Sequence, residues 1–168
     1  MGKCSEIRKV IPEFRVSINI SQVQASKSDV IQDISGEMKR AGLPLEALIV
    51  ELTESDLLEQ NINEKHFLTE LKRMGISLAL DDFGTGYSSL DMLKKMPADI
   101  VKIDRAFVHG VDASNFDESF IQFIVAICHK VNIEVCAEGV ETEAEFQILY
   151  PMNVDTIQGY YFGKPMRD

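Results

Sequence analysis

Two adjacent aspartates, Asp81 and Asp82, directly follow the apolar run at residues 76–80. Other short apolar runs also contain or end in a polar side chain, and these are Asn19, Glu51, Lys102, Glu138 and Gln158. Carboxylate and amide oxygens are the ligands that Mg²⁺ and Mn²⁺ prefer. Two adjacent carboxylates can hold two such ions about 4 Å apart, as in-line phosphodiester cleavage requires, and a lysine can orient the attacking water. These residue types therefore suit a two-metal hydrolytic site.

Each of these residues has a simpler explanation when it is taken alone. An aspartate at the end of a strand usually caps a helix or forms a turn. Buried strand ends, however, seldom have so many carboxylates without partners. The set as a whole therefore favours a functional site, provided that the fold brings the strand ends together.

Short apolar runs alternate with amphipathic stretches along the chain. The runs are typical of parallel strands buried on both faces, and they lie at residues 14–20, 48–52, 76–80, 100–103, 133–137 and 156–158. The periodicity predicts helices over residues 30–41, 63–74, 116–131 and 142–149. The last of these begins with a capping box from Thr142 to Glu145. The alternation predicts an α/β protein with a parallel sheet.

The spacing of the strands bears on how that sheet is arranged. Strand starts lie about 28 residues apart on average, close to the repeat of a (β/α) barrel. A doubly wound sheet is the alternative. In a barrel the carboxyl ends of the strands converge on one rim, whereas the outer strands of an open sheet lie too far apart to share a pocket. We therefore expect an incomplete TIM-like (β/α) barrel of about six units.

The composition argues against several classes of protein. The chain has 168 residues, with 17 Lys and Arg against 27 Asp and Glu, and its formal net charge of −10 argues against binding to long nucleic acid. Hydrophobic residues make up 45% and charged residues 26%, as in ordinary globular domains. No apolar run approaches the roughly 20 residues of a membrane span, so we expect no membrane segment. Three cysteines without a CxxC pair predict reduced thiols and a cytoplasmic location.

Several segments resemble the EAL-domain family, bacterial phosphodiesterases that open cyclic di-GMP. In family order they are SINIS (17–21), ELTES (51–55), DDFGTGYSS (81–89), VKIDR (101–105), AEGVET (137–142) and QGYYFGKP (158–165). Together they cover nearly the whole chain. The resemblance implies a TIM-like barrel, two Mg²⁺ or Mn²⁺ ions, and hydrolysis of cyclic di-GMP to linear pGpG.

The resemblance also implies a role for each residue of the metal and catalytic set. The implied metal ligands are Asn19, Glu51, Asp81 and Asp82. Asp81 would bridge the two ions, and Asp82 would serve the second. Lys102 resembles the family lysine that contacts the catalytic water. Glu138 resembles the catalytic glutamate, which acts as a general base or as a ligand of the second metal.

Three further residues are expected to support this set. Glu141 resembles the glutamate that anchors the loop at 83–89, a loop that couples metal binding to dimerisation in the family. Gln158 resembles a glutamine near the water and the metals. Asp104 follows Lys102 in the same segment, and we expect it to contact the metal ligands or the substrate.

One departure from the family pattern concerns its signature, a Glu-Ala-Leu followed closely by an arginine. The signature should precede the SINIS segment, but the 16 residues before Ser17 do not contain it. Glu46–Leu48 spells the three letters, yet it leads into the second expected strand and no arginine follows at 49 or 50. We therefore expect residues 1–168 to be a partial EAL domain that lacks one metal ligand and a phosphate-binding arginine. We expect weak or absent activity from this chain alone.

Two alternatives stay open. Degenerate EAL domains bind cyclic di-GMP or a protein without hydrolysis, and the chain could be such a regulatory module, although its retained metal ligands argue against ordinary degeneration. Sheet edges left by missing units could also pair between copies, which would give an edge-to-edge or domain-swapped homodimer.

Overall fold

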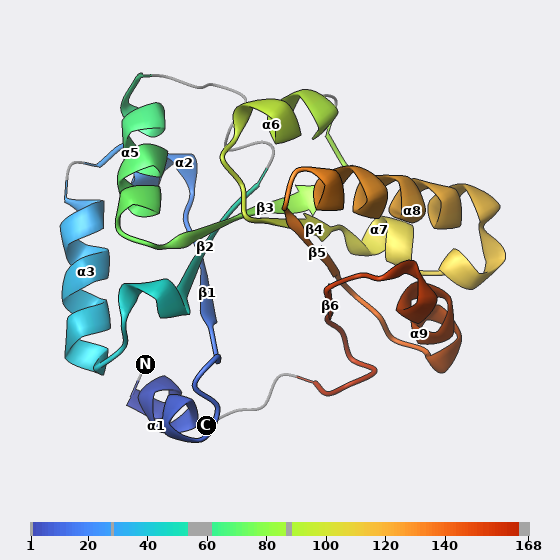
Figure 1. The fold of residues 1–168 in the computed structure, drawn as a ribbon, viewed down its shortest axis with the longest axis horizontal. Helices are drawn as coiled ribbons and strands as arrows, with labels where there is room; N and C mark the ends of the chain where they lie inside the picture. The colour runs from blue at the N-terminus through green and yellow to red at the C-terminus, as the bar shows by residue number, and fades with distance from the viewer. Residues whose placement is uncertain (1, 28, 54–61, 87–88, 165–168) are drawn as a thin grey trace. The chain divides into compact units, whose positions relative to one another are not determined.

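The computed structural model describes residues 2–27, 29–53, 62–86 and 89–164. The chain forms two compact units, Met1–Ala79 and Leu80–Asp168, which divide within strand β3 (Ser77–Phe83). Each unit combines parallel strands with helices (Figure 1). Within the described ranges we find no helix with the length and hydrophobicity that a bilayer span requires.

The first unit contains short parallel strands and several helices. Before β3 its elements are α1 (Gly2–Val10), β1 (Val16–Asn19), α2 (Gln22–Ala25), α3 (Val30–Ala41), the 3₁₀ turn η1 (Leu45–Ala47), β2 (Leu48–Thr53) and α5 (Ile62–Arg73). β1 pairs with β2 in a register that sets Asn19 opposite Glu51. Gly42 ends α3 with a φ of 66°, a left-handed conformation that glycine adopts without strain.

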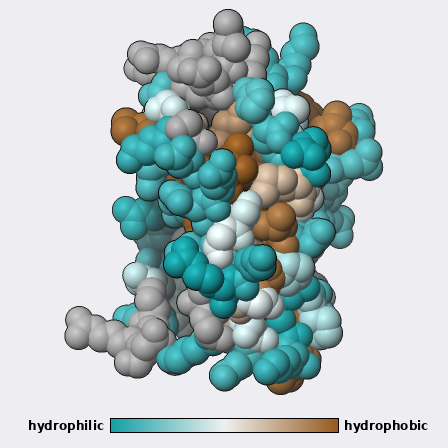
Figure 2. Space-filling model, turned by 90° about the vertical axis from the view of Figure 1, so that its left-hand side faces the viewer, coloured by the Kyte–Doolittle hydropathy of each residue, from teal (hydrophilic) through white to brown (hydrophobic). Residues whose placement is uncertain are grey.

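The helices of this unit are amphipathic, as their residue spacing predicts. α3 buries Ile34 and Met38, and α5 buries Phe67, Leu68 and Leu71. Burial of one such side chain contributes about 1.5–3 kcal/mol. The face drawn in Figure 2, on the side where these helices lie in Figure 1, is mainly hydrophilic, with hydrophobic residues in a broken band. α3 has the predicted bounds, and α5 begins one residue before the predicted helix.

The second unit contains the remaining strands and the longest helix. After β3 its elements are α6 (Ser89–Lys95), β4 (Ile100–Ile103), α7 (Arg105–Val108), η2 (Val111–Ala113), α8 (Asn115–Lys130), β5 (Glu134–Ala137), α9 (Glu143–Leu149), η3 (Tyr150–Met152) and β6 (Thr156–Ile157). β4 pairs with β5, and β5 with β6, both in parallel. α8 begins after Ser114, whose hydroxyl accepts the N–H of Asp117 at 3.2 Å.

Consecutive strands are neighbours in both units. The order is β1-β2-β3 in the first unit and β3-β4-β5-β6 in the second. A doubly wound sheet reverses its strand order at a switch point. The observed order therefore excludes that alternative and confirms the predicted α/β class with parallel strands.

Several elements differ from the sequence-based expectation. β3 runs to Phe83 rather than ending at residue 80, because Phe83 is completely buried and the strand continues past two aspartates to place it in the core. α1, α2, α6 and α7 were not predicted. α7 has only four residues and begins at a local cap, in which the Asp104 carboxylate accepts the N–H of Ala106 at 2.8 Å. A helix of one turn leaves no periodic hydrophobic pattern to detect.

Candidate active site

Lys102 is the buried centre of the candidate site in the second unit. It lies on β4, where all four residues are buried, and its side chain is 9% exposed. Its ammonium Nζ lies 3.1 Å from Asp81 Oδ1 on β3 and 2.7 Å from Glu138 Oε1, just after β5. A buried lysine is stable only with such partners. The parallel strands therefore bring together three residues that lie far apart in the sequence.

The backbone after each strand holds this group in place. The N–H of Glu138 donates to the carbonyl of Ile103 at 3.1 Å, which continues the β4–β5 pairing by one residue. The N–H of Asp104 donates to the carbonyl of Phe83 at 3.4 Å, which continues the pairing of β3 and β4 in the same way. Both carboxylates that contact Lys102 are thus held by strands rather than by free loops.

Asp82 has an unusual backbone conformation beside this group. Its φ of 54° lies in the left-handed region, which a non-glycine residue rarely adopts. Its N–H donates to Asp81 Oδ1 at 3.1 Å, and its carbonyl accepts the Thr85 hydroxyl at 2.9 Å. Burial, together with the negative charges of Asp81 and Asp104, raises the pKa of Asp82 above its ordinary value, although Lys102 opposes this. Burial is the largest of these causes, and the two neighbouring carboxylates add to it.

A cavity of about 340 Å³ opens beside these side chains. Its lining residues are Asp82, Asp104, Arg105, Glu138, Gly139, Glu141, Gln158, Gly159 and Tyr160. Two glycines let its walls approach closely. A Cβ on Gly139 would lie 2.4 Å from the Cβ of Arg105, and one on Gly159 would lie 2.0 Å from the carbonyl oxygen of Val140.

The cavity unites most of the predicted residues of this unit. Asp104 has two roles, since it caps α7 and also lines the cavity. Gln158 is exposed, but its backbone is hydrogen-bonded to the segment between β5 and α9. Its N–H donates to the carbonyl of Ala137 at 2.9 Å, and its carbonyl accepts the N–H of Val140 at 3.1 Å. Glu141 is exposed at the rim. Its predicted anchoring of the loop at 83–89 stays a prediction, since residues 87–88 lie outside the described residues.

The other two predicted metal ligands lie in the first unit. Asn19 ends β1, and Glu51 is opposite to it on β2. Glu51 is 7% exposed, whereas Asn19 is exposed. The N–H of Ile20 donates to the backbone carbonyl of Glu51 at 3.1 Å, so the pairing with β2 continues one residue beyond β1. The first unit therefore places an amide and a carboxylate side by side.

The donor set suits a divalent cation by its chemistry. Within the described ranges, no three His, Cys, Asp or Glu side chains lie close enough together to hold a metal ion by themselves. The predicted ligands are oxygen donors, which hard cations prefer. The carboxylates of Asp81 and Asp104 also act on Asp82, and a cation would relieve this repulsion. The oxygen donors within each unit therefore suit a divalent metal by their chemistry.

Sequence reasoning missed two features of the cavity wall. Arg105 is not among the predicted site residues, and although it is exposed, it also lines the cavity. Tyr160 lines the cavity as well, with 55% of its surface exposed. Both residues lie one or two positions after a predicted site residue, Asp104 or Gln158. Proximity in sequence was the only available signal, and it does not reveal which way a side chain points.

Comparison with known proteins gives a consistent match over nearly the whole chain. Residues 3–165 match the family model described as the EAL domain. The chain is 37% identical over 154 residues to "Cyclic di-GMP phosphodiesterase NbdA" of Pseudomonas aeruginosa, covering 91% of this chain and 20% of that protein. The chain spans about a fifth of the length of the curated relatives that it matches first.

Solved structures agree in fold. A structure of the MucR phosphodiesterase from the same species, in complex with c-di-GMP, superposes with a TM-score of 0.87 at 32% identity, covering 98% of this chain and 67% of that one. The manganese and cyclic di-GMP complex of Klebsiella pneumoniae BlrP1 superposes with a TM-score of 0.87 at 28% identity, covering 94% and 41%. The predicted fold, a TIM-like (β/α) barrel represented here by six strands, is confirmed.

Proposed function

Because this chain belongs to the EAL-domain family, we propose that it contributes the metal-binding and catalytic residues for hydrolysis of cyclic di-GMP to linear pGpG. The observation that carries the proposal is the ammonium of Lys102 held between Asp81 and Glu138, beside a cavity that Arg105 also lines. This arrangement pairs a cationic group, which can neutralise charge developing on a phosphate, with a carboxylate that can accept a proton. Relatives named as cyclic di-GMP phosphodiesterases support the choice of substrate.

We propose that two Mg²⁺ or Mn²⁺ ions bind to Asn19, Glu51, Asp81 and Asp82. The BlrP1 complex with manganese and cyclic di-GMP supports a divalent ion of this kind. When bound, such ions lower the pKa of a coordinated water and offset phosphate charge. Asp81 would serve both ions, as the family resemblance implies, and its contact with the Lys102 ammonium at 3.1 Å would hold it in place.

The protein side chains have separate tasks in this proposal. Lys102 orients the attacking water and neutralises charge as the phosphodiester bond breaks. Glu138 accepts a proton from that water as a general base. Arg105 attracts a phosphate of the dinucleotide into the cavity, since guanidinium and phosphate groups form strong charge-assisted hydrogen bonds. Gln158 also lines the cavity, where its amide can bind the water or the substrate.

The test measures turnover and binding separately. The chain is incubated with cyclic di-GMP and Mn²⁺ or Mg²⁺, and pGpG is quantified by chromatography. Calorimetry with Ca²⁺, a cation expected to support binding without turnover, measures the affinity for cyclic di-GMP. Glu138→Gln should abolish turnover and retain binding. Lys95→Met should change neither, because Lys95 is exposed, pairs with Asp91 and does not line the cavity.

The outcomes distinguish the two functions that the sequence leaves open. Turnover that depends on Glu138, even at the weak level expected of this chain alone, supports the phosphodiesterase proposal. Binding in Ca²⁺ without turnover in Mn²⁺ or Mg²⁺ contradicts it and favours a non-catalytic binding module. No binding and no turnover would contradict both and leave a protein-contact role.

Two finer points belong to the same proposal. We place the activity in the cytoplasm, which the cysteine content supports because the three cysteines have no CxxC spacing. We also propose a homodimer formed through exposed sheet edges or by swapping, since unpaired strand edges readily associate. Light scattering that shows only monomer over a wide concentration range would contradict the dimer.

A further inference from the structure

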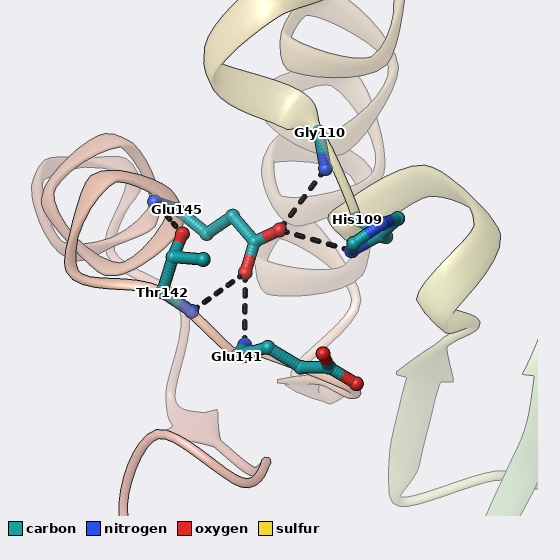
Figure 3. Close-up of polar contacts among 5 residues, drawn as sticks. All are labelled: His109, Gly110, Glu141, Thr142 and Glu145. Atoms are coloured by element: carbon teal, nitrogen blue, oxygen red, sulfur yellow. Dashed lines mark hydrogen bonds and ion pairs between the residues drawn. The ribbon is translucent and has the colours of Figure 1, made fainter.

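A buried carboxylate at the start of α9 joins two segments that line the cavity (Figure 3). Glu145 is 2% exposed, although charged side chains are rarely buried unless they are paired. One of its oxygens, Oε2, accepts the N–H of Glu141 at 2.8 Å and the N–H of Thr142 at 3.0 Å. The Thr142 hydroxyl in turn accepts the N–H of Glu145 at 3.2 Å, which completes the predicted capping box.

The second oxygen of the same carboxylate reaches a distant segment. Glu145 Oε1 accepts the N–H of Gly110 at 3.0 Å and lies 3.2 Å from Nδ1 of His109. These two residues directly follow α7, and Gly110 has a φ of 77°, so its N–H is presented from a left-handed turn. Figure 3 shows this oxygen turned toward Gly110 and His109, with the other turned toward Glu141 and Thr142.

The two segments joined in this way contain most of the cavity lining. The segment before Gly110 includes Asp104 and Arg105, directly after Lys102 on β4. The segment before Thr142 includes Glu138 and Glu141, directly after β5. The two segments also touch where a Cβ on Gly139 would meet Arg105. Glu145 thus provides a second, polar connection between the same segments.

The Glu145 carboxylate uses both of its oxygens, whereas a capping box alone needs only one side-chain acceptor. Glutamine serves as well as glutamate at this position of a capping box. Glu145 uses one oxygen for the cap and the other for Gly110 and His109. Burial by itself would raise the pKa of Glu145, but hydrogen bonds from Glu141, Gly110 and Thr142 lower it below its ordinary value. The side chain therefore stays ionised at neutral pH and accepts hydrogen bonds on both oxygens.

We propose that Glu145 is a positioning residue, whose carboxylate fixes the β5–α9 segment to the end of α7 and so holds Glu138 in register with Lys102. The proposal rests on the proposed phosphodiesterase function for its catalytic consequence, but the structural connection can be tested without it. Glu145 lies outside the cavity lining, and it acts only through the segments that it joins.

The decisive variant is Glu145→Gln, which distinguishes the role of one carboxylate oxygen from that of the other. Its single amide oxygen can keep the capping box with Glu141 and Thr142. Its NH₂ group would then face the N–H of Gly110, so the connection to α7 is lost. We expect kcat to fall about tenfold and KM to change by less than about twofold, since a small displacement of a catalytic group impairs the chemical step more than binding.

Asp155→Asn is the matched control for loss of a carboxylate charge. Asp155 Oδ2 also accepts a backbone N–H, from Val135 at 2.7 Å, and contacts His129 Nε2 at 2.8 Å. Because one oxygen makes both contacts, the amide oxygen of asparagine can keep them, and Asp155 lines no part of the candidate cavity. We expect kcat of Asp155→Asn to stay at the wild-type value.

Amide hydrogen exchange tests the connection even when no turnover is measured. In Glu145→Gln, the amides of residues 105–110 and 138–142 should exchange about tenfold faster or more. In Asp155→Asn, the amides of these two segments should exchange at the wild-type rate. Absent turnover by the wild type contradicts the proposed function, whereas unchanged exchange at 138–142 in Glu145→Gln contradicts the positioning role. A kcat that falls equally in both variants also contradicts it.

A second variant keeps the inference testable if Glu145→Gln does not fold. His109→Ala removes a side chain that is 70% exposed, so the fold should be preserved. It weakens only the α7 side of the connection, and we expect faster exchange at 105–110 and a kcat lowered about two- to threefold. Wild-type exchange and wild-type kcat in this variant would overturn the proposal.

Discussion

Replacing Lys102 by methionine tests how strongly the candidate site depends on its central charge. Methionine keeps the length of the side chain and removes the ammonium that lies 3.1 Å from Asp81 and 2.7 Å from Glu138. At an effective dielectric constant of about 20, each contact is worth about 5–6 kcal/mol of gross attraction. Desolvation of the charges offsets most of this attraction. The variant is left with two neighbouring carboxylates and no counter-charge from the lysine.

The expected loss of stability follows from how deeply the three groups are buried. Removing one partner from a fully buried ion pair typically costs about 3–5 kcal/mol. Here the carboxylate side chains stay 13% and 20% exposed, so water partly solvates them. We expect Lys102→Met to lower the free energy of unfolding by about 2–4 kcal/mol, with an unchanged m-value.

The assay is urea unfolding followed by circular dichroism, with Lys95→Met as the control. Lys95 pairs with Asp91, but both side chains are more than half exposed, so this substitution should cost less than about 1 kcal/mol. Turnover should fall about 10²–10³-fold in Lys102→Met, since a group that stabilises developing charge is lost. A loss of stability in Lys102→Met no larger than that in Lys95→Met would refute the reasoning.

Two further predictions concern the same unit. The pKa of Asp155 is below its ordinary value, because its hydrogen bonds outweigh the effect of burial. Its contribution to stability should therefore be complete above about pH 4 and decline as the pH falls further, and acid unfolding of Asp155→Asn should lack that decline. Gly139→Ala adds a Cβ that would lie 2.4 Å from the Cβ of Arg105, whereas Gly42→Ala has the same kind of positive φ and open space around it. Thermal unfolding should show a loss of about 1 kcal/mol for Gly42→Ala and a larger loss for Gly139→Ala, and equal losses would contradict the steric argument.

The sequence predicts the repeating elements well because their signals are local. α3 and β4 have the predicted bounds, since each is a regular pattern followed by a clear stop or a polar residue. The end of β3 was misplaced because two aspartates interrupt its apolar run, and the burial of Phe83 is a tertiary effect. α7 was missed because one helical turn has no measurable period.

In the candidate site, too, the features set by local sequence were predicted, and those set by distant contacts were not. Residue type and position at strand ends were sufficient to select Asp81, Lys102 and Glu138, and the structure brings these three together. The sequence also identified Glu145 as part of a capping box, but not its bond to Gly110, which is 35 residues away. A contact over such a separation depends on how α7 and α9 pack, and no pattern within either helix encodes it.

The ion pairs of Lys102 with Asp81 and Glu138 explain why polar residues can occupy buried positions at the ends of these strands. β4 is buried at every residue, so a lysine there is tolerated only if carboxylates from both neighbouring strands reach it. Asp81 and Glu138 likewise lie in a partly buried setting, with the ammonium of Lys102 as their counter-charge. Each side chain therefore makes the others stable, and the three form one unit rather than three independent sites.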